Sequence, residues 1–314
     1  MTFFETVASM LDAQVPALAA DLGMSVPELH SRMATHLDTM AKEWRAQRTP
    51  SIAYEDPICR LAYIFGHVPI NANLFYHALV EPYVDLLAQG LFSSLGESIR
   101  SHAEKVGRLR LCAFGGGPGT ELIALSKYLS KNPISRAHFD LEFLLLDEVR
   151  EWAESWEAMK EAIYDNFSLD APRPFSISGL VLPFDMTDLA QYSTMNQVFR
   201  RDLYVFNHVV SEVFDPAKLE RLANVVAVLR QKAAANASFV FLDRNDDQTR
   251  TAVAGILGVA GLTQVHESKV GGSMDGDEQK EVLAEHIAGI GRRPRVQWRV
   301  GPNGNRAAFF VLAH

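Results

Sequence analysis

The feature that most constrains the fold of this chain is a glycine-rich turn between two apolar segments. An apolar run covers residues 109–114, the turn occupies 115–119 (Gly-Gly-Gly-Pro-Gly), and an apolar helical pattern continues over 122–129. A strand that turns into a helix through glycines lets a ligand approach bare backbone, because no Cβ atom stands in the way. The N–H groups at the start of the helix then face that ligand. The turn therefore predicts a ligand site at a strand–helix junction.

The spacing of the glycines bears on which ligand binds there. A dinucleotide-binding turn has the form G-x-G-x-x-G, with the pyrophosphate over the helix N-terminus. Here glycines fall at 115, 117 and 119, with Pro118 between the last two. That spacing does not fit the dinucleotide pattern, so an NAD(P)-dependent enzyme is a disfavoured alternative.

From residue 108 onward, strand-like segments alternate with helical patterns, which is the signature of a parallel sheet with helical crossovers. Two strand segments, 143–146 and 239–242, are continuously apolar, as expected for strands buried on both faces. The predicted strands are 109–114, 141–146, 176–182, 203–206 and 238–242, and the predicted helices are 121–129, 151–166, 216–232 and 248–258.

Residues 1–105 have a different pattern, with apolar residues at helical spacing throughout. Ser25 is the predicted cap of one helix, because Glu28 follows three residues later. Further helices are predicted over 57–65 and 72–95. This part of the chain is expected to form a helical region distinct from the sheet.

The C-terminal part contains one turn signal and one ambiguous span. An Asn-Gly pair at 303–304 lies between two strand-like runs, 296–300 and 307–312, and predicts a hairpin. The span 269–292 begins with glycine and charge and continues as a short helix.

Composition narrows the class of protein. The chain has 314 residues, 48% hydrophobic and 22% charged, which is typical of an ordinary globular protein. No apolar run reaches the roughly 18–20 residues that span a bilayer. The N-terminus does not resemble a signal peptide. The two cysteines, Cys59 and Cys112, exclude a disulfide framework, and Cys112 is expected to be a buried small hydrophobe. We therefore predict a cytoplasmic protein without a metal site.

The net charge of −8 weighs against a protein that binds bulk nucleic acid, which usually has a basic footprint. The one basic cluster comprises Arg292, Arg293 and Arg295, with Arg299 and Arg306 nearby. A local RNA-binding face stays open as an alternative.

Several polar residues follow the strand ends, where ligands bind in an open α/β sheet. Asp147 ends an apolar strand about 30 residues after the glycines, and one carboxylate can accept from both hydroxyls of a ribose. The alternative is a helix N-cap. Glu121, in the first turn of the helix after the glycines, could hold a ligand or simply interact with the helix dipole.

The segment 207–212 follows the fourth strand and carries the predicted catalytic residues. His208 can take a proton near neutral pH, and Glu212 can orient an amine or act as a base if burial raises its pKa. Asn207 can hydrogen-bond the substrate or the ligand. The alternative for Asn207 is a helix cap. After the fifth strand, 243–247 can line the substrate side, with Asp246 equally suited to a helix cap.

With these residues placed, residues 109–250 resemble the class I S-adenosylmethionine (SAM)-dependent methyltransferases. The glycine turn is similar to their motif I, and the resemblance implies that Gly115, Gly116, Gly117 and Gly119 pass under the methionine part of SAM. The family often carries an acidic residue two positions before the first glycine, where this chain has Ala113, so Glu121 is the candidate replacement.

The resemblance also assigns the strand ends. It implies that Asp185 accepts from the adenine amino group while Met186 lies against the ring, with Asp188 as an alternative carboxylate. It places Asn207, His208 and Glu212 beside the transferred methyl group. The forms of 114–121 and 207–214, with Asp147 and Trp152, look most like the branch that contains fungal large-subunit rRNA uridine-N3 methyltransferases.

The helical N-terminal region is expected to supply the substrate wall. Tyr63, His67, Tyr76 and His77 cluster around Gly66 and Pro69 and are the predicted substrate-binding residues, with packing between lid and sheet as the alternative. Trp152 and Trp156, four residues apart, are expected to pack between helix and sheet.

Together these observations predict an α/β protein with a Rossmann-like, seven-stranded methyltransferase sheet and an N-terminal helical domain. Residues 1–105 form the predicted lid, substrate or dimerisation domain, and 106–314 the SAM-binding domain. The expected activity is methyl transfer from SAM to oxygen or nitrogen of a small-molecule acceptor, in a possible homodimer. An RNA (base) methyltransferase and a non-catalytic SAM-binding protein are the alternatives.

Overall fold

The structure is a computed structural model of the chain. It describes residues 2–46, 51–85, 91–135, 139–166, 175–193, 198–271, 273–296 and 308–314.

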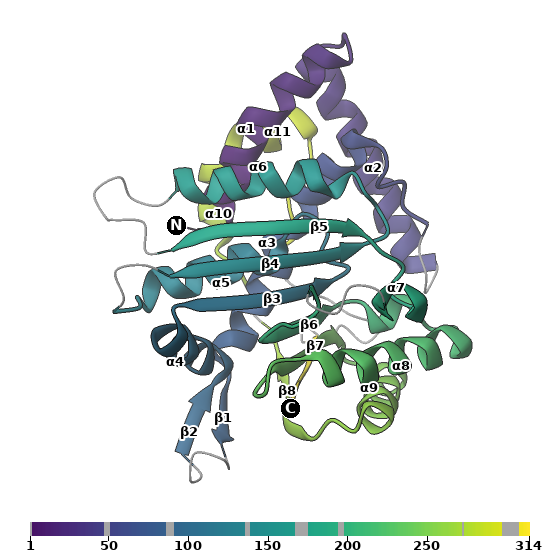
Figure 1. Ribbon diagram of the computed structural model, residues 1–314. Coiled ribbons are helices and arrows are strands. Elements are labelled where there is room, and N and C mark those ends of the chain that lie inside the picture. The colour runs from purple at the N-terminus through teal and green to yellow at the C-terminus, as the bar shows by residue number, and fades with distance from the viewer. Residues whose placement is uncertain are drawn as a thin grey trace.

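A seven-stranded sheet in the order β5-β4-β3-β6-β7-β9-β8 forms the centre of the molecule (Figure 1). The strands from β3 to β7 pair in parallel, and β9 pairs antiparallel with both β7 and β8. The predicted Rossmann-like α/β fold with a seven-stranded sheet is confirmed. The strands are β3 (Arg108–Phe114), β4 (Asp140–Asp147), β5 (Ser176–Pro183), β6 (Leu203–Asn207), β7 (Ser238–Arg244), β8 (Gln264–Val270) and β9 (Ala308–Ala313).

Helices cover both faces of the sheet. Where crossover helices were predicted, the helices are α5 (Thr120–Lys131), α6 (Trp152–Asp165), α8 (Pro216–Lys232) and α9 (Asp247–Ala260). Three long helices precede the sheet: α1 (Phe3–Asp21), α2 (Val26–Ala46) and α3 (Pro57–Val80). The shorter elements are α4 (Leu95–Val106), α7 (Leu189–Ser193), α10 (Gly276–Val282), α11 (Ala284–Ile290) and a 3₁₀ turn at Val210–Glu212. Ser25 caps α2 by accepting from the Glu28 N–H, as predicted.

Alternate residues of the strands point to opposite faces and build two cores. In β3, Leu109, Leu111 and Ala113 join a core with α1, α3 and α5, whereas Cys112 and Phe114 face α8 and α9. Cys112 is fully buried, as expected of a small hydrophobe. The first core contains residues of both the N-terminal helices and the sheet, so these two parts of the chain are packed through one apolar interior.

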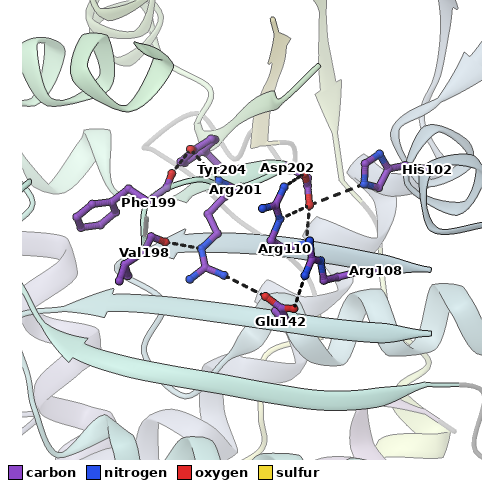
Figure 2. Close-up of polar contacts among 9 residues, drawn as sticks. All are labelled: His102, Arg108, Arg110, Glu142, Val198, Phe199, Arg201, Asp202 and Tyr204. Carbon is purple, nitrogen blue, oxygen red and sulfur yellow. Dashed lines mark hydrogen bonds and ion pairs between the residues drawn. The ribbon is translucent and has the colours of Figure 1, made fainter. Parts of the chain in front are cut away.

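The amino ends of the central strands are joined by an ion-pair network, away from the strand ends where the candidate site lies (Figure 2). Arg110 of β3 makes a bidentate contact to Asp202, just before β6, with N···O distances of 2.7 and 3.0 Å. Although burial would raise the pKa of Asp202, the hydrogen bonds from Arg110 hold it below its ordinary value. Glu142 of β4 lies between Arg108 and Arg201. The network holds β3, β4 and β6 in register at the amino edge.

The bounds of two predicted helices in the N-terminal region are wrong. The segments 57–65 and 72–95 were expected to be separate helices, but α3 runs without interruption from Pro57 to Val80. It ends there because Glu81, which precedes Pro82, has an extended backbone. A hairpin of β1 (Pro82–Asp85) and β2 (Leu91–Ser94) follows and projects beside α4 in Figure 1.

The C-terminal region also differs from the prediction. Strand β8 was missed because its residues, Gln264–Val270, are mostly polar, as expected of an edge strand with one open side. Within the run 307–312, the described residues 308–312 do belong to a strand, β9, but its described partners are β7 and β8. The Asn303-Gly304 turn, Arg299 and Arg306 lie outside the described residues. The ambiguous span 269–292 contains the end of β8 and the two short helices α10 and α11.

Candidate functional site

Strand register brings the predicted site residues to one edge of the sheet. Phe114, Leu146 and Phe206 lie side by side at the carboxyl ends of β3, β4 and β6. The residues that follow them, Gly115, Asp147 and Asn207, are therefore neighbours. In Figure 1 the arrowheads of β3, β4 and β5 all point to this edge.

The four glycines of the turn have two different roles. Gly115 and Gly117 line a cavity and have φ of 59° and 45°, which other L-residues rarely adopt. Gly119 also has a positive φ, but a Cβ there would lie 2.7 Å from the Trp156 ring, and a Cβ on Gly116 would lie 3.0 Å from Leu145. Gly116 and Gly119 thus allow close packing, and the cavity-facing backbone is that of Gly115 and Gly117.

Glu121 and Asn207 form a polar pair at the start of α5. The Asn207 Nδ2 donates to Glu121 Oε1 at 2.8 Å. The remaining oxygens of the pair, Glu121 Oε2 and Asn207 Oδ1, are buried and accept no hydrogen bond from the described residues. Burial raises the pKa of Glu121 to about 7, opposed by the hydrogen bond from Asn207. Because both residues line the cavity, the pair offers two acceptors to a ligand that donates.

Ala113 does not take part in this pair. It is 1% exposed and belongs to the apolar core on the face of β3 that packs against the N-terminal helices. A carboxylate at this position would be buried among hydrocarbon side chains, which is costly without a partner. Glu121 supplies the carboxylate at this end of the cavity instead.

Asp147 holds the glycine turn in place. Its Oδ2 accepts from the Gly117 N–H at 3.1 Å and its Oδ1 from the Val149 N–H at 2.9 Å. It does not cap α6, whose N-cap residue is Glu151. Burial raises the pKa of Asp147 to about 6, although both backbone hydrogen bonds lower it. Each carboxylate oxygen has a second lone pair, so Asp147 can still accept from two ligand hydroxyls.

Asp185, and not Asp188, lines the cavity. Asp185 follows β5 and accepts through Oδ1 from both the backbone N–H and the hydroxyl of Thr187. Met186 lies beside it and is half-buried. Asp188 instead accepts from the Ala190 N–H at the start of α7. The carboxylate and the thioether therefore lie at the same end of the cavity.

His208 lines the cavity and is held next to a buried carboxylate. Its backbone N–H donates to Leu242 O of β7 at 2.8 Å, and its Nδ1 lies 3.9 Å from Asp243 Oδ1. Asp243 is fully buried, and burial would raise its pKa, but the His208 imidazole and hydrogen bonds from Ser211 hold it below the ordinary value. His208 has a φ of 60°, the one positive φ of a non-glycine residue in the described part of the chain. A side chain kept in so uncommon a conformation is a candidate for function.

Glu212 also contributes a carboxylate to the cavity lining. By surface area its side chain is exposed, but it lines the cavity, where protein surrounds it. This enclosure, followed by the carboxylates of Asp243 and Asp147, raises the pKa of Glu212 above its ordinary value. The residue can therefore take up a proton at a pH where an exposed glutamate could not.

The cavity has a volume of about 750 Å³, in the range typical of small-molecule sites. Carboxylates outnumber cations strongly in its lining, where Lys218 is the one lysine or arginine among the described residues. The acidic lining residues are Glu55, Glu121, Asp147, Glu148, Asp185, Glu212 and Asp215. Among the described residues no cluster of three or more His, Cys, Asp or Glu side chains is arranged to hold a metal ion.

The N-terminal helices close the cavity with aromatic side chains, and one of the four predicted substrate residues is among them. Tyr63 of α3 lines the cavity together with Tyr54 and with Trp152 of α6, whose rings contact one another. His67 is buried against Trp44 and Tyr63, outside the lining. Tyr76 and His77 lie elsewhere, Tyr76 against Phe3 and beside the Lys127 ammonium. Trp156 packs between α6 and the sheet, whereas Trp152 both packs and lines the cavity.

Asn71 belongs to the same polar cluster of the sequence as Tyr63 and His67, and it lines the cavity. Asp243 belongs to the segment 243–247 that was expected on the substrate side, and it lies beside His208 instead of lining the cavity. Tyr54 was not singled out by the sequence, since its position depends on how the N-terminal region docks on the sheet. Of the segment 243–247, Asp246 caps α9 by accepting from the Thr249 N–H, and none of its residues lines the cavity.

The fold of this chain is similar to the folds of several solved structures. No family model matches the chain, and no curated protein matches it. Similar structures include precorrin-6y C5,15-methyltransferase from Geobacter metallireducens (8% identity, 69% of this chain and 88% of that one, TM-score 0.37). Also similar is a TehB-like SAM-dependent methyltransferase from Corynebacterium glutamicum (14% identity, 65% of this chain and 79% of that one, TM-score 0.33). A third is an arsenic(III) S-adenosylmethionine methyltransferase from Chlamydomonas reinhardtii (12% identity, 65% of this chain and 62% of that one, TM-score 0.32).

No helix in the described ranges is both long and apolar enough to cross a membrane.

Proposed function

We propose that this protein is a SAM-dependent methyltransferase that acts on a small-molecule acceptor. The observation that carries the proposal is the pair of buried acceptors, Glu121 Oε2 and Asn207 Oδ1, beside the cavity-facing backbone of Gly117. A ligand with an ammonium group satisfies both acceptors. A ligand carboxylate at the same end fits the N-terminus of α5, where the first N–H groups have no intrahelical acceptor.

The rest of the cavity fits the remaining parts of SAM. Asp147 can accept from the ribose hydroxyls, since each of its oxygens keeps a free lone pair. Asp185 can accept from the adenine amino group, and Met186 supplies an apolar surface for the ring. These roles extend over one continuous cavity and require no further residue.

When bound, SAM supplies an electrophilic methyl group. The residues of this chain then have three tasks: to align the acceptor, to exclude water and to hold a proton released by the acceptor. His208 is suited to the last task, because its Nδ1 lies 3.9 Å from the carboxylate of the fully buried Asp243. Glu212 is a second group that can hold a proton, since its pKa is raised.

The acidic lining favours a small acceptor over RNA. A polynucleotide would bring phosphates toward seven carboxylates and a single lysine, and like charges repel. The alternative of RNA as acceptor predicts binding that weakens steeply with salt. The finer resemblance to rRNA uridine methyltransferases stays a prediction, as do the cytoplasmic location and the homodimer.

The experiment is a calorimetric titration of the purified protein with SAM and, separately, with NAD. We expect one SAM site per chain and no saturable NAD binding. Asp147→Asn should weaken SAM about tenfold or more, because ribose recognition loses a charged acceptor. Thermal unfolding of the same variant shows whether the turn at Gly117 is intact. Binding of NAD in preference to SAM would contradict the proposal.

A further inference from the structure

The contacts proposed for SAM leave one wall of the cavity without an assigned role. It consists of Tyr54, Tyr63 and Trp152, whose rings are mutually inclined, with centroid distances of 5.3 to 5.7 Å. Tyr54 and Tyr63 come from the N-terminal region, and Trp152 begins α6. The three rings line the cavity as an aromatic corner. One face of Tyr63 is stacked against His67, and the π-surface that the corner leaves toward the cavity attracts cations.

A carboxylate faces this aromatic corner. Glu212 lines the same cavity. Burial is the main cause that raises the pKa of both tyrosines, and the Glu212 carboxylate raises it further. Among the described residues, no arginine lines the cavity, and Lys218 is the one lysine that does. Lys218 lies in α8, and Glu212 lies in the 3₁₀ turn that precedes this helix. The corner therefore combines π-faces with a carboxylate, and the Arg244 guanidinium lowers the raised pKa of Glu212 only in part.

A buried acceptor completes the wall. Asn71 of α3 is 7% exposed and lines the cavity, and its Nδ2 donates to the Tyr63 hydroxyl at 3.1 Å. Its Oδ1 is buried and accepts no hydrogen bond from the described residues. Buried polar atoms are usually satisfied, so an unsatisfied oxygen in a cavity wall points to a donating ligand.

We propose that this wall, formed by Tyr54, Tyr63, Trp152, Asn71 and Glu212, binds the acceptor as a protonated amine. That the amine is the methyl acceptor rests on the proposed function, whereas binding of an amine to the wall does not depend on that function. The rings contact the cation, Glu212 pairs with its charge, and Asn71 Oδ1 accepts one N–H.

The same arrangement serves the chemistry of an amine acceptor. An ammonium has no lone pair and cannot attack a methyl group. Glu212 can take one proton from it, which leaves a neutral amine with a lone pair and a neutral carboxyl group. A carboxylate with a raised pKa is better suited to this transfer than an ordinary one. The acceptor class is thus a primary or secondary amine with an apolar body.

The test compares three probes of similar size and different charge: 2-phenylethylamine, 2-phenylethanol and phenylacetate. Each is titrated into the protein by calorimetry, with and without saturating S-adenosylhomocysteine. We expect the amine to bind about tenfold tighter than the alcohol, and phenylacetate to show no saturable binding. An alcohol that binds as tightly as the amine would overturn the inference.

Two variants and a control assign the preference to the wall. Glu212→Gln should reduce the amine-to-alcohol ratio to about threefold or less, and Tyr54→Leu should weaken the amine more than the alcohol. Glu220→Gln, at an exposed position on α8, should leave the ratio unchanged. A ratio that is the same in Glu212→Gln and the unaltered protein would overturn the role of Glu212.

Competition separates this inference from the proposed function. If the amine displaces S-adenosylhomocysteine, it occupies the site at Glu121 and the inference fails. If S-adenosylhomocysteine does not bind at all, the proposed function fails, while the titration without it still decides whether the wall prefers an amine.

Discussion

At the scale of single residues, Glu121 is a carboxylate that the ligand-free protein tolerates poorly. It is 2% exposed, and one of its two oxygens has no donor among the described residues. An ionised group in such a place destabilises the fold unless a ligand satisfies it. Ionised Glu121 is therefore expected to favour ligand binding and to lower the stability of the ligand-free fold, so a substitution there tests both effects.

Glu121→Gln should stabilise the ligand-free protein and weaken SAM binding. Between pH 4.5 and about 7, the folded protein binds more protons at Glu121 than the unfolded chain does. Its contribution to stability therefore falls as pH rises through this window. The variant's advantage should grow over the same range, to an upper limit of about 3 kcal/mol. Urea unfolding at pH 5 and pH 8 measures it, with Glu285→Gln as an exposed control on α11.

A gain in stability that is equal at both pH values would contradict this assignment. Binding of SAM to the unaltered protein should strengthen as pH rises through about 7, because ionised Glu121 is the form that accepts from an ammonium.

His208 combines a functional side chain with an unfavourable backbone. We expect His208→Asn to lower turnover by about 10² to 10⁴, the usual range for loss of a general acid or base. Asparagine tolerates a positive φ better than most residues, so the variant should fold normally. Calorimetry should give an almost unchanged SAM affinity. Turnover equal to that of the unaltered protein would remove His208 from the mechanism.

At the scale of elements, the parallel strands and their crossover helices were predicted to within one or two residues at most ends. Their sequences suffice because strands buried on both faces are continuously apolar, and the helices between them are periodic. The β1–β2 hairpin and β8 were missed. Neither is fully enclosed, so neither has a strong hydrophobic pattern, and Pro82 was the one available sign that α3 ends.

Gly119 of the glycine turn can be compared with Gly255 of α9, because packing requires a glycine at the first position and not at the second. Gly119→Ala would place a Cβ 2.7 Å from Trp156 at a φ of 87°, and it should destabilise the protein by about 2 kcal/mol or more. Gly255→Ala, within α9, meets nothing within 4 Å and should stabilise it by about 0.5–1 kcal/mol. Chemical denaturation of both variants measures the difference. Equal effects at the two positions would refute the packing role of Gly119.

At the scale of the whole molecule, the N-terminal helices and the sheet enclose the cavity together. Phe4 of α1, Phe65 of α3 and Leu111 of β3 belong to the same buried core. We therefore expect one cooperative thermal transition, and saturating S-adenosylhomocysteine should move it upward as a unit. Two calorimetric peaks, of which the ligand moves only one, would contradict a shared core.

The site residues that the sheet positions were predictable from the sequence. Those positioned by the docking of the N-terminal helices on the sheet were not. Asp147, Asp185, Asn207 and His208 each follow a strand, so the topology alone brings them together. Tyr76 and His77 were proposed from composition, and α3 directs them away from the cavity toward α1 and α5. Which face of a packed helix meets a cavity depends on contacts between segments far apart in the sequence, and local periodicity does not encode it.

The most direct test of the central claim is a crystal structure of the protein soaked with S-adenosylhomocysteine. We predict that its ammonium lies within hydrogen-bond distance of Glu121 Oε2 and Asn207 Oδ1, and that its ribose hydroxyls contact Asp147. Ligand density at a distance from all three residues, or clear density for the protein without any ligand in this cavity, would contradict the claim.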